Sequence, residues 1–147
     1  SQLYAIELEN FLTRNGFTKA TARNVWIEKN GVGEALCSMM RRDGWNITEY
    51  NATGKSRSAG YYDLYLDMDA GKFRILESMR HYETLRRQMN AHSVNLDGDA
   101  PKVLPKEKVR ALLGCSPDFS DATYIANLAR RQQISYSKKS RFRLVNV

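Results

Sequence analysis

Short β-prone runs and longer amphipathic segments alternate along the whole chain, and this alternation limits the folds that are open to it. Helical periodicity, with helix start and stop signals, predicts helices over residues 3–15, 34–42, 61–70, 82–90, 105–113 and 117–132. Runs rich in β-branched and aromatic residues predict strands at 23–28, 45–50, 73–76, 94–96 and 102–104. Strands that alternate with helices favour an α/β domain with a mixed sheet flanked by helices.

Two connections between these elements have a distinct composition. Asp97-Gly98 lies between the last two strand runs, and an Asp-Gly pair suits the tight turn of a hairpin. Residues 51–60 are polar and contain two glycines, which predicts a mobile loop.

Length and composition indicate a folded, soluble domain. The 147 residues predict one domain over 1–133, followed by a basic C-terminal tail over 134–147 that we expect to be poorly ordered. A hydrophobic content of 42% excludes an intrinsically disordered chain. No apolar run approaches the ~20 residues of a membrane-spanning helix. Cys37 and Cys115 do not form a disulfide framework, and with two histidines they give no zinc pattern, so a reducing cytoplasm is expected.

The charge balance indicates a polyanionic partner. Lys and Arg number 23 against 16 Asp and Glu, which gives a net charge of +7. A basic surface of this size is typical of proteins that bind nucleic acid, although many basic proteins do not. The tail contributes Lys138, Lys139, Arg141 and Arg143, either as a solvated terminus or as a contact to nucleic acid.

The segment 114–122, which reads GCSPDFSDA, is a loop that leads into a helix and carries two carboxylates. Ser116 is a natural N-cap, and Pro117 fits the first helical turn. Residues three apart are neighbours on a helix, so we expect Asp118 and Asp121 to share a face on which they would bind a divalent cation. The simpler alternative for Asp118 is a capping acid that the helix dipole favours.

A third carboxylate, Glu28, ends a predicted strand just before the Asn30–Gly33 turn. Ligands of α/β sheets gather at this end of the strands. If Glu28 converges with Asp118 and Asp121, Mg²⁺ or Mn²⁺ is the expected partner because clustered carboxylates repel one another without a cation. Two such ions about 4 Å apart would hydrolyse a phosphodiester. Taken alone, Glu28 reads as an ordinary strand-end acid. The aspartates at 63, 67 and 69 have the spacing of a solvated helix face.

These residues resemble a known family. Two segments resemble the C-terminal nuclease domain of phage terminase large subunits. Segment 25–33 is a hydrophobic strand that ends in an acid before Asn-Gly-x-Gly. Segment 106–122 is a Lys-containing helix that leads into Gly-x-Ser-Pro-Asp-x-x-Asp-Ala. The resemblance covers about residues 20 to 130. It implies an RNase H-like fold of the resolvase and integrase type. It also implies an endonuclease that uses divalent metal, Mg²⁺ or Mn²⁺, to cut concatemeric double-stranded DNA during viral packaging. It also implies, as partners, the terminase ATPase domain, the small terminase subunit and the portal, in the cytoplasm of an infected or lysogenic bacterium.

The resemblance implies specific roles for the three acids. Glu28 matches the strand acid of the second family motif, and Asp121 matches the metal-binding acid of the last helix. Asp118 stands where a further ligand or a proton-handling residue is often found.

The resemblance also implies where DNA would bind. The loop 51–60 carries Lys55 and Arg57, and the hairpin 94–104 resembles one that many of these domains insert near the DNA groove. We therefore expect Lys55, Arg57, Lys102 and Lys106 to contact DNA.

The sequence departs from the family at its start. The family's opening strands and the metal-binding Asp that they carry have no counterpart here, and no Walker A pattern occurs. We therefore expect this chain to be part of a longer protein or a truncated derivative, completed by a preceding segment, a partner chain or a dimer mate. Two alternatives stay open: a non-catalytic module that binds DNA or a packaging component, and a resolvase-like nuclease of the same fold.

Overall fold

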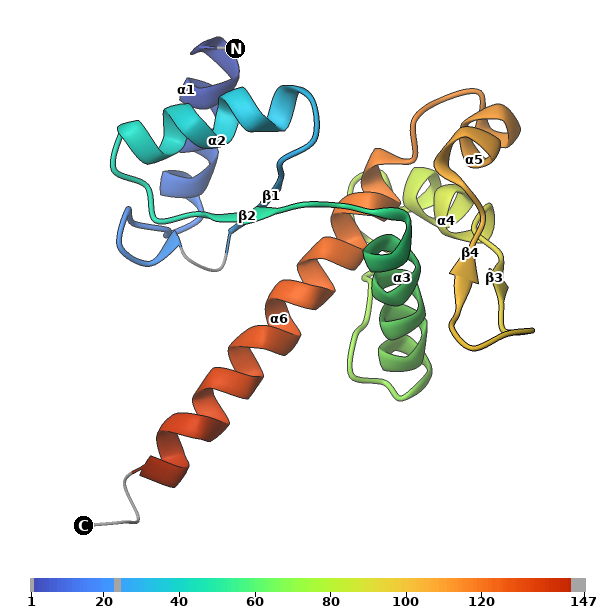
Figure 1. The fold of residues 1–147 in the computed structure, drawn as a ribbon. Helices are drawn as coiled ribbons and strands as arrows, with labels where there is room; N and C mark the ends of the chain where they lie inside the picture. The colour runs from blue at the N-terminus through green and yellow to red at the C-terminus, as the bar shows by residue number, and fades with distance from the viewer. Residues whose placement is uncertain (1, 23–24, 144–147) are drawn as a thin grey trace. The chain divides into compact units, whose positions relative to one another are not determined.

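The computed structural model describes residues 2–22 and 25–143, and their side chains as far as Ile134. This part of the chain is mixed α/β, with six helices and two small sheets of two strands each (Figure 1). In chain order the elements are α1 (Gln2–Arg14), β1 (Trp26–Glu28), α2 (Val32–Arg42), β2 (Thr48–Tyr50), α3 (Gly54–Asp69), α4 (Tyr82–Asn90), β3 (Val94–Asn95), β4 (Lys102–Val103), α5 (Lys106–Leu113) and α6 (Asp118–Arg143). No helix in the described part of the chain is both long enough and apolar enough to cross a bilayer.

The chain divides into two compact units. The first comprises residues 1–52 and 133–147, and the second comprises residues 53–132. The domain expected over 1–133 is thus divided after Ala52.

The first unit is built on a strand–helix–strand arrangement. Strands β1 and β2 are parallel, with Glu28 opposite Tyr50 at their carboxyl ends, and α2 connects them. The Trp26 and Tyr50 rings lie 5.8 Å apart on this ladder. Helices α1 and α2 share a core with the segments that precede β1 and β2. This core consists of Ala5, Leu12, Ala22, Cys37, Met40, Trp45 and Ile47. Parallel strands need a crossover connection, which is usually a helix, so the predicted alternation of strand and helix is confirmed in this unit.

The turn after β1 requires glycine at two positions. Gly31 has φ +63°, in the left-handed region that side chains disfavour. A Cβ on Gly33 would lie only 1.7 Å from the Glu28 carbonyl oxygen, so the backbone at the start of α2 lies directly against the end of β1. The Asn30–Gly33 segment therefore fixes how the helix leaves the strand on which Glu28 lies.

The second unit packs α3 and α6 against α4, α5 and the antiparallel hairpin of β3 and β4. Its apolar core consists of Tyr61, Leu64, Leu85, Met89, Val103, Val109, Tyr124 and Ile125. Helices α3 and α6 approach closely at Gly60, because a Cβ there would lie 2.5 Å from the Tyr124 ring. The hairpin at 94–104 and the helix at 82–90 are both confirmed.

Three predicted segments are corrected by the structure. Residues 54–60 are the first turns of α3 and not a loop, because Thr53 and Ser56 form a reciprocal capping box. Residues 73–76 form no strand. Helix α6 continues to Arg143 and does not end at residue 132, while residues 144–147 of the expected tail lie outside the described part.

Candidate functional site

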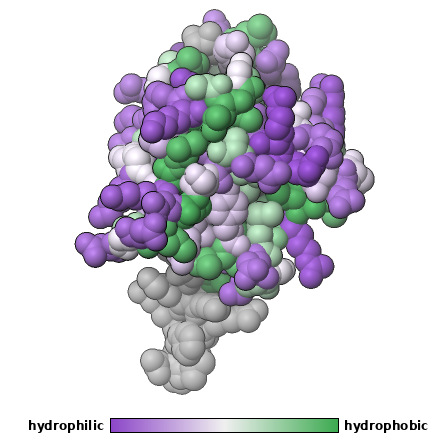
Figure 2. Space-filling view, turned by 90° about the vertical axis from the view of Figure 1, so that its right-hand side faces the viewer, coloured by the Kyte–Doolittle hydropathy of each residue, from purple (hydrophilic) through white to green (hydrophobic). Residues whose placement is uncertain are grey.

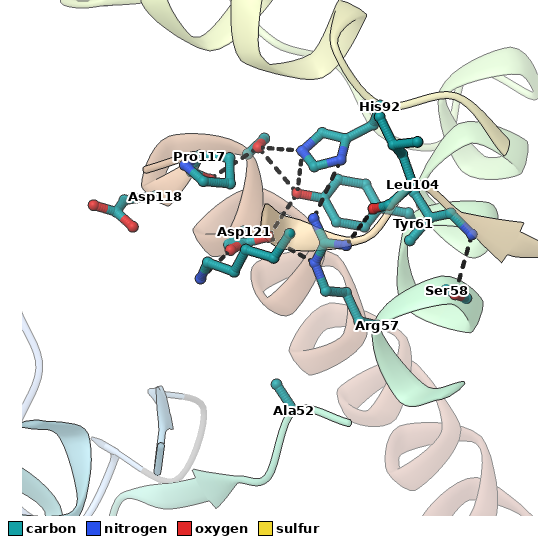
Figure 3. Close-up of polar contacts among 12 residues, drawn as sticks. Ala52, Arg57, Ser58, Tyr61, His92, Leu104, Pro117, Asp118 and Asp121 are labelled. Atoms are coloured by element: carbon teal, nitrogen blue, oxygen red, sulfur yellow. Dashed lines mark hydrogen bonds and ion pairs between the residues drawn. The ribbon is translucent and has the colours of Figure 1, made fainter. Parts of the chain in front are cut away.

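Asp121 is the centre of a buried polar network in the second unit. It lies in the first turn of α6, where its backbone N–H donates to the Pro117 carbonyl at 2.9 Å, and it is 4% exposed. Its Oδ1 accepts from the Tyr61 hydroxyl at 2.8 Å and from Arg57 Nε at 3.3 Å. Its Oδ2 lies 2.6 Å from the Lys106 ammonium (Figure 3). The two carboxylate oxygens therefore have different partners.

Arg57 uses its whole guanidinium inside this network. Besides Asp121, it donates from Nη1 to the Leu104 carbonyl at 2.9 Å and from Nη2 to His92 Nδ1 at 3.2 Å. The guanidinium also lies over the Tyr61 ring, with its carbon 5.0 Å from the ring centre. Arg57 thus ties α3 to the segment that follows β4 and to α6, and it is buried.

His92 completes the network at the end of α4. Its Nε2 lies 2.9 Å from the Tyr61 hydroxyl and 3.0 Å from Ser120 Oγ. Burial, reinforced by the charge of Arg57, lowers the pKa of His92 to about 4. The imidazole is therefore neutral at pH 7.

Tyr61 joins His92 to Asp121. It is fully buried, and burial together with the charge of Asp121 raises the pKa of its phenol far above the ordinary value. The hydroxyl therefore keeps its proton at neutral pH and acts as a donor to the carboxylate.

Protein cations offset the charge of Asp121 without a bound ion, and they leave the network with one net positive charge. A single carboxylate is bound by two protein cations, Arg57 and Lys106, in a site where an unpaired charge would be costly. Repulsion between carboxylates, which motivated the expectation of a metal, does not act on Asp121 in this arrangement.

Asp118 does not share the environment of Asp121. It is exposed, it accepts a hydrogen bond from the Ser116 hydroxyl, and it points away from the network in Figure 3. The expectation that both carboxylates face the same way is therefore wrong. Three residues along a helix turn the side chain by about 300°, which is enough to move it across the boundary between surface and core.

Glu28 belongs to the first unit, whereas Asp118 and Asp121 belong to the second. Glu28 is half-buried at the carboxyl end of β1, and Asn30 Nδ2 donates to its Oε1 at 3.2 Å. The same amide donates to the Ala52 carbonyl at 2.9 Å, which links the ends of the two parallel strands. Among residues 2–22 and 25–143 no three His, Cys, Asp or Glu side chains are grouped as ligands for a metal ion.

The four residues expected to contact DNA differ in accessibility. Lys55 and Lys102 are exposed, Lys106 is held by Asp121 with 26% of its side chain accessible, and Arg57 is buried. Figure 2, which looks onto the side where α5 and the β3–β4 hairpin lie, shows hydrophilic side chains on both sides of a band of hydrophobic ones. The expectation of an exposed Arg57 is corrected, because its segment is helical and directs the side chain into the core.

A second buried carboxylate lies further along α3. Asp67 is 4% exposed and accepts from Arg130 and Arg131 of α6 at 2.7 Å each, and Arg131 also pairs with Asp63 at 2.6 Å. The hydrogen bond from Arg131 is the main cause that lowers the pKa of Asp67 to about 2. A solvated helix face therefore describes Asp69 but not Asp67.

Sequence reasoning singled out Asp121, Arg57 and Lys106 but gave Tyr61 and His92 no role. His92 is buried, and both of its ring nitrogens have partners. One signal was present: Arg57 and Tyr61 are four apart, which places them on one face once the segment is recognised as a helix. No protein-family model, curated protein or solved structure was found to match this chain.

Proposed function

We propose that this chain is part of a divalent-metal-dependent endonuclease domain that acts on double-stranded DNA, of the RNase H-like type found in phage terminase large subunits. Asp121 carries the proposal. It is a buried carboxylate at the start of a helix, in the segment on which the family resemblance is most specific, and protein side chains hold it in one orientation.

The donor chemistry of Asp121 is compatible with Mg²⁺ or Mn²⁺. Both ions prefer carboxylate oxygens. Oδ1 is bound by two buried groups of α3, whereas Oδ2 is bound by Lys106, which is partly exposed and has a flexible side chain. Movement of Lys106 would therefore free one oxygen for a metal ion without disturbing the other.

When bound, such an ion would activate water and stabilise the leaving oxygen of a phosphodiester. Asp121 would be its ligand in the second unit. Asp118 is exposed and would serve as a further ligand or in proton handling. The exposed Lys55 and Lys102 would contact the phosphate backbone, which fixes position without reading sequence.

The parallel strand pair supports the proposed fold. Glu28 lies at the carboxyl end of a β–α–β unit, which is the end at which α/β proteins place catalytic residues. The terminase ATPase domain, the small terminase subunit and the portal are the partners that this proposal includes.

The test is metal binding by the chain itself, measured as the rise in melting temperature with Mn²⁺, together with nicking of supercoiled plasmid. A ligand present at 100 times its dissociation constant stabilises by about 2.7 kcal/mol. Asp121→Asn should remove the Mn²⁺-dependent rise and any nicking. Asp63→Asn, which removes the same charge from α3, is the matched control and should retain both. A wild-type chain that shows neither effect, or an Asp121→Asn variant that keeps both, would refute the proposal.

The second candidate is a non-catalytic module that binds DNA or a packaging component. The specific observation in its favour is that two protein cations, Lys106 and Arg57, already pair with Asp121. This candidate predicts no effect of metal but a steep loss of DNA affinity with salt, because binding would depend on released counterions. A resolvase-like nuclease would instead require metal and prefer branched over linear DNA.

A further inference from the structure

A single side-chain amide joins the ends of the parallel strands in the first unit. Asn30 Nδ2 donates to Glu28 Oε1 at 3.2 Å and to the Ala52 carbonyl at 2.9 Å, and we call these two hydrogen bonds the Asn30 clamp. Asn30 and Gly31 are both exposed. Apart from its chain neighbours, no described residue lies within 4 Å of the position that a Cβ on Gly31 would take. The clamp therefore stands in an open turn that water can reach.

The backbone N–H that follows Asn30 is available for reaction. A glycine after Asn has no Cβ, so its nitrogen can approach the Asn Cγ closely, and it must lose its proton before it attacks. In the part of the chain that the structure describes, the Gly31 N–H donates to no backbone carbonyl. The chain has three other Asn-Gly or Asp-Gly pairs, and their glycine N–H groups are all bound: Gly16, Gly44 and Gly98 donate to the carbonyls of Thr13, Arg41 and Leu96 at 3.1, 3.0 and 2.9 Å.

We propose that Asn30 is a site of spontaneous deamidation and that the reaction opens the Asn30 clamp. The deprotonated Gly31 nitrogen attacks Asn30 Cγ, a bond forms between these two atoms, and the bond from Cγ to Nδ2 breaks. Ammonia leaves, and it takes up the proton that the Gly31 nitrogen has lost. Water then opens the resulting succinimide ring at one of its two carbonyl carbons, which leaves aspartate or isoaspartate at position 30. Water is the only co-reactant.

Either product removes the donor on which the clamp depends. A carboxylate in place of the amide offers only acceptors to the Glu28 carboxylate and to the Ala52 carbonyl, which are acceptors themselves. Isoaspartate also lengthens the main chain by one carbon, in a turn where a Cβ on Gly33 would already lie 1.7 Å from the Glu28 carbonyl oxygen. The reaction therefore loosens the ends of β1 and β2 in a fraction of molecules that grows with time.

This inference does not depend on the proposed function, and neither metal nor DNA enters its test. The folded chain is kept at pH 8 and at pH 6, and deamidation is followed by mass spectrometry of tryptic peptides. Trypsin cleaves after Arg14 and Lys29, so the two Asn-Gly pairs begin separate peptides, 15–19 and 30–41. Asn30 should convert several-fold faster than Asn15, and faster at pH 8 because the attacking nitrogen must lose its proton.

The same measurement in urea separates the structure from the local sequence. In the unfolded chain neither glycine N–H is bound, so Asn15 and Asn30 should convert at similar rates. Conversion of Asn15 as fast as that of Asn30 in the folded chain, or no conversion of Asn30 at pH 8, would overturn the proposal. The same ratio of rates in the folded and the unfolded chain would also overturn it.

The effect on the clamp is tested by urea unfolding of the first unit, followed by the fluorescence of Trp26 and Trp45. Asn30→Asp should unfold at a lower urea concentration than the wild type, and the wild-type chain kept at pH 8 should acquire a fraction that unfolds with it. Asn30→Gln is the control, because its longer side chain closes the ring far more slowly, so its midpoint should not change during the incubation. An Asn30→Asp midpoint equal to that of the wild type, or an equal change with time in Asn30→Gln, would overturn the role of the clamp.

Discussion

Acid should destabilise the second unit through His92. The imidazole has a pKa of about 4 in the folded chain, against an ordinary value of 6.5. Burial and the neighbouring charges of Arg57 and Lys106 lower this pKa, and the charge of Asp121 opposes them. Between pH 6.5 and 4 the unfolded chain therefore binds more protons than the folded chain. The stabilisation is fully present above pH 6.5 and is lost as the pH falls toward 4.

The size of the effect follows from the pKa values. Lowering the pKa of His92 from 6.5 to about 4 corresponds to roughly 3 kcal/mol of unfolding free energy. The structure gives the reason for this cost. A protonated Nδ1 would place a second donor opposite the Arg57 N–H at 3.2 Å, in a site where both residues are less than one-tenth exposed.

The pH dependence from Asp67 lies below the pH range in which His92 acts. Asp67, the other strongly perturbed acid, has a pKa lowered to about 2 from 3.8, so its stabilisation is present above 3.8 and is lost only below that value. His81 is exposed. The loss of stability between pH 6.5 and 4.5 should therefore report His92.

The assay is urea unfolding at several pH values between 7 and 4.5, followed by amide NMR signals of residues 53–132. Both tryptophans, Trp26 and Trp45, lie in the first unit, so their fluorescence follows that unit separately. The control is His92→Gln, which should be less stable at pH 7 and should lose the dependence on pH. Stability of the wild-type second unit that does not change across this range, or the same slope in the variant, would refute the assignment of the effect to His92.

Three substitutions test the packing and charge of the second unit by urea unfolding. Asp121→Ala should cost about 3 kcal/mol or more, because it leaves buried cations without their partner, and the same stability as the wild type would show that the network contributes nothing. Asp67→Asn should cost a similar amount, about 3 kcal/mol, by removing the charge that two arginines of α6 share, and an unchanged melting temperature would refute this. Gly60→Ala should destabilise by about 1–3 kcal/mol because its Cβ would lie 2.5 Å from the Tyr124 ring. Gly54→Ala, at the start of α3, is the control and should not destabilise because the space around its Cβ is open. An equal effect of the two substitutions would contradict the close approach of α3 and α6.

Elements with local signals could be predicted from the sequence, and elements with competing signals could not. Helix α4 and the β3–β4 hairpin have one consistent pattern each, and the structure contains both. Helix α3 begins with Gly54 and a serine-rich turn, a composition that reads as loop, yet the Thr53–Ser56 capping box provides the partners that its first N–H groups need. A cap that depends on two short polar side chains is easily mistaken for a turn.

Burial along α1 also differs from the sequence pattern. Leu3, Ile6 and Phe11 are large apolar residues of the helix predicted over 3–15 but are at least half exposed, whereas Ala5 and Leu12 are buried. The apolar residues of α1 spread around more than one face, so periodicity alone does not decide which side packs against α2. The structure selects the side on which the Trp45 indole can donate to Glu9 at 2.9 Å.

The candidate site shows why a site residue can be found from sequence while its environment cannot. Asp121 stands in a short motif, but its partners Arg57, Tyr61 and Lys106 come from other elements, and Arg57 is 64 residues away in the chain. No local rule connects such positions. What a local rule does provide is the pairing of Arg57 with Tyr61, since residues four apart on α3 face the same side. Two polar side chains on the inner face of a helix, each too costly to bury alone, require a common polar partner in the core. A buried carboxylate is the partner that accepts from both, so correct assignment of α3 as a helix is the step that would have placed Asp121 inside the fold.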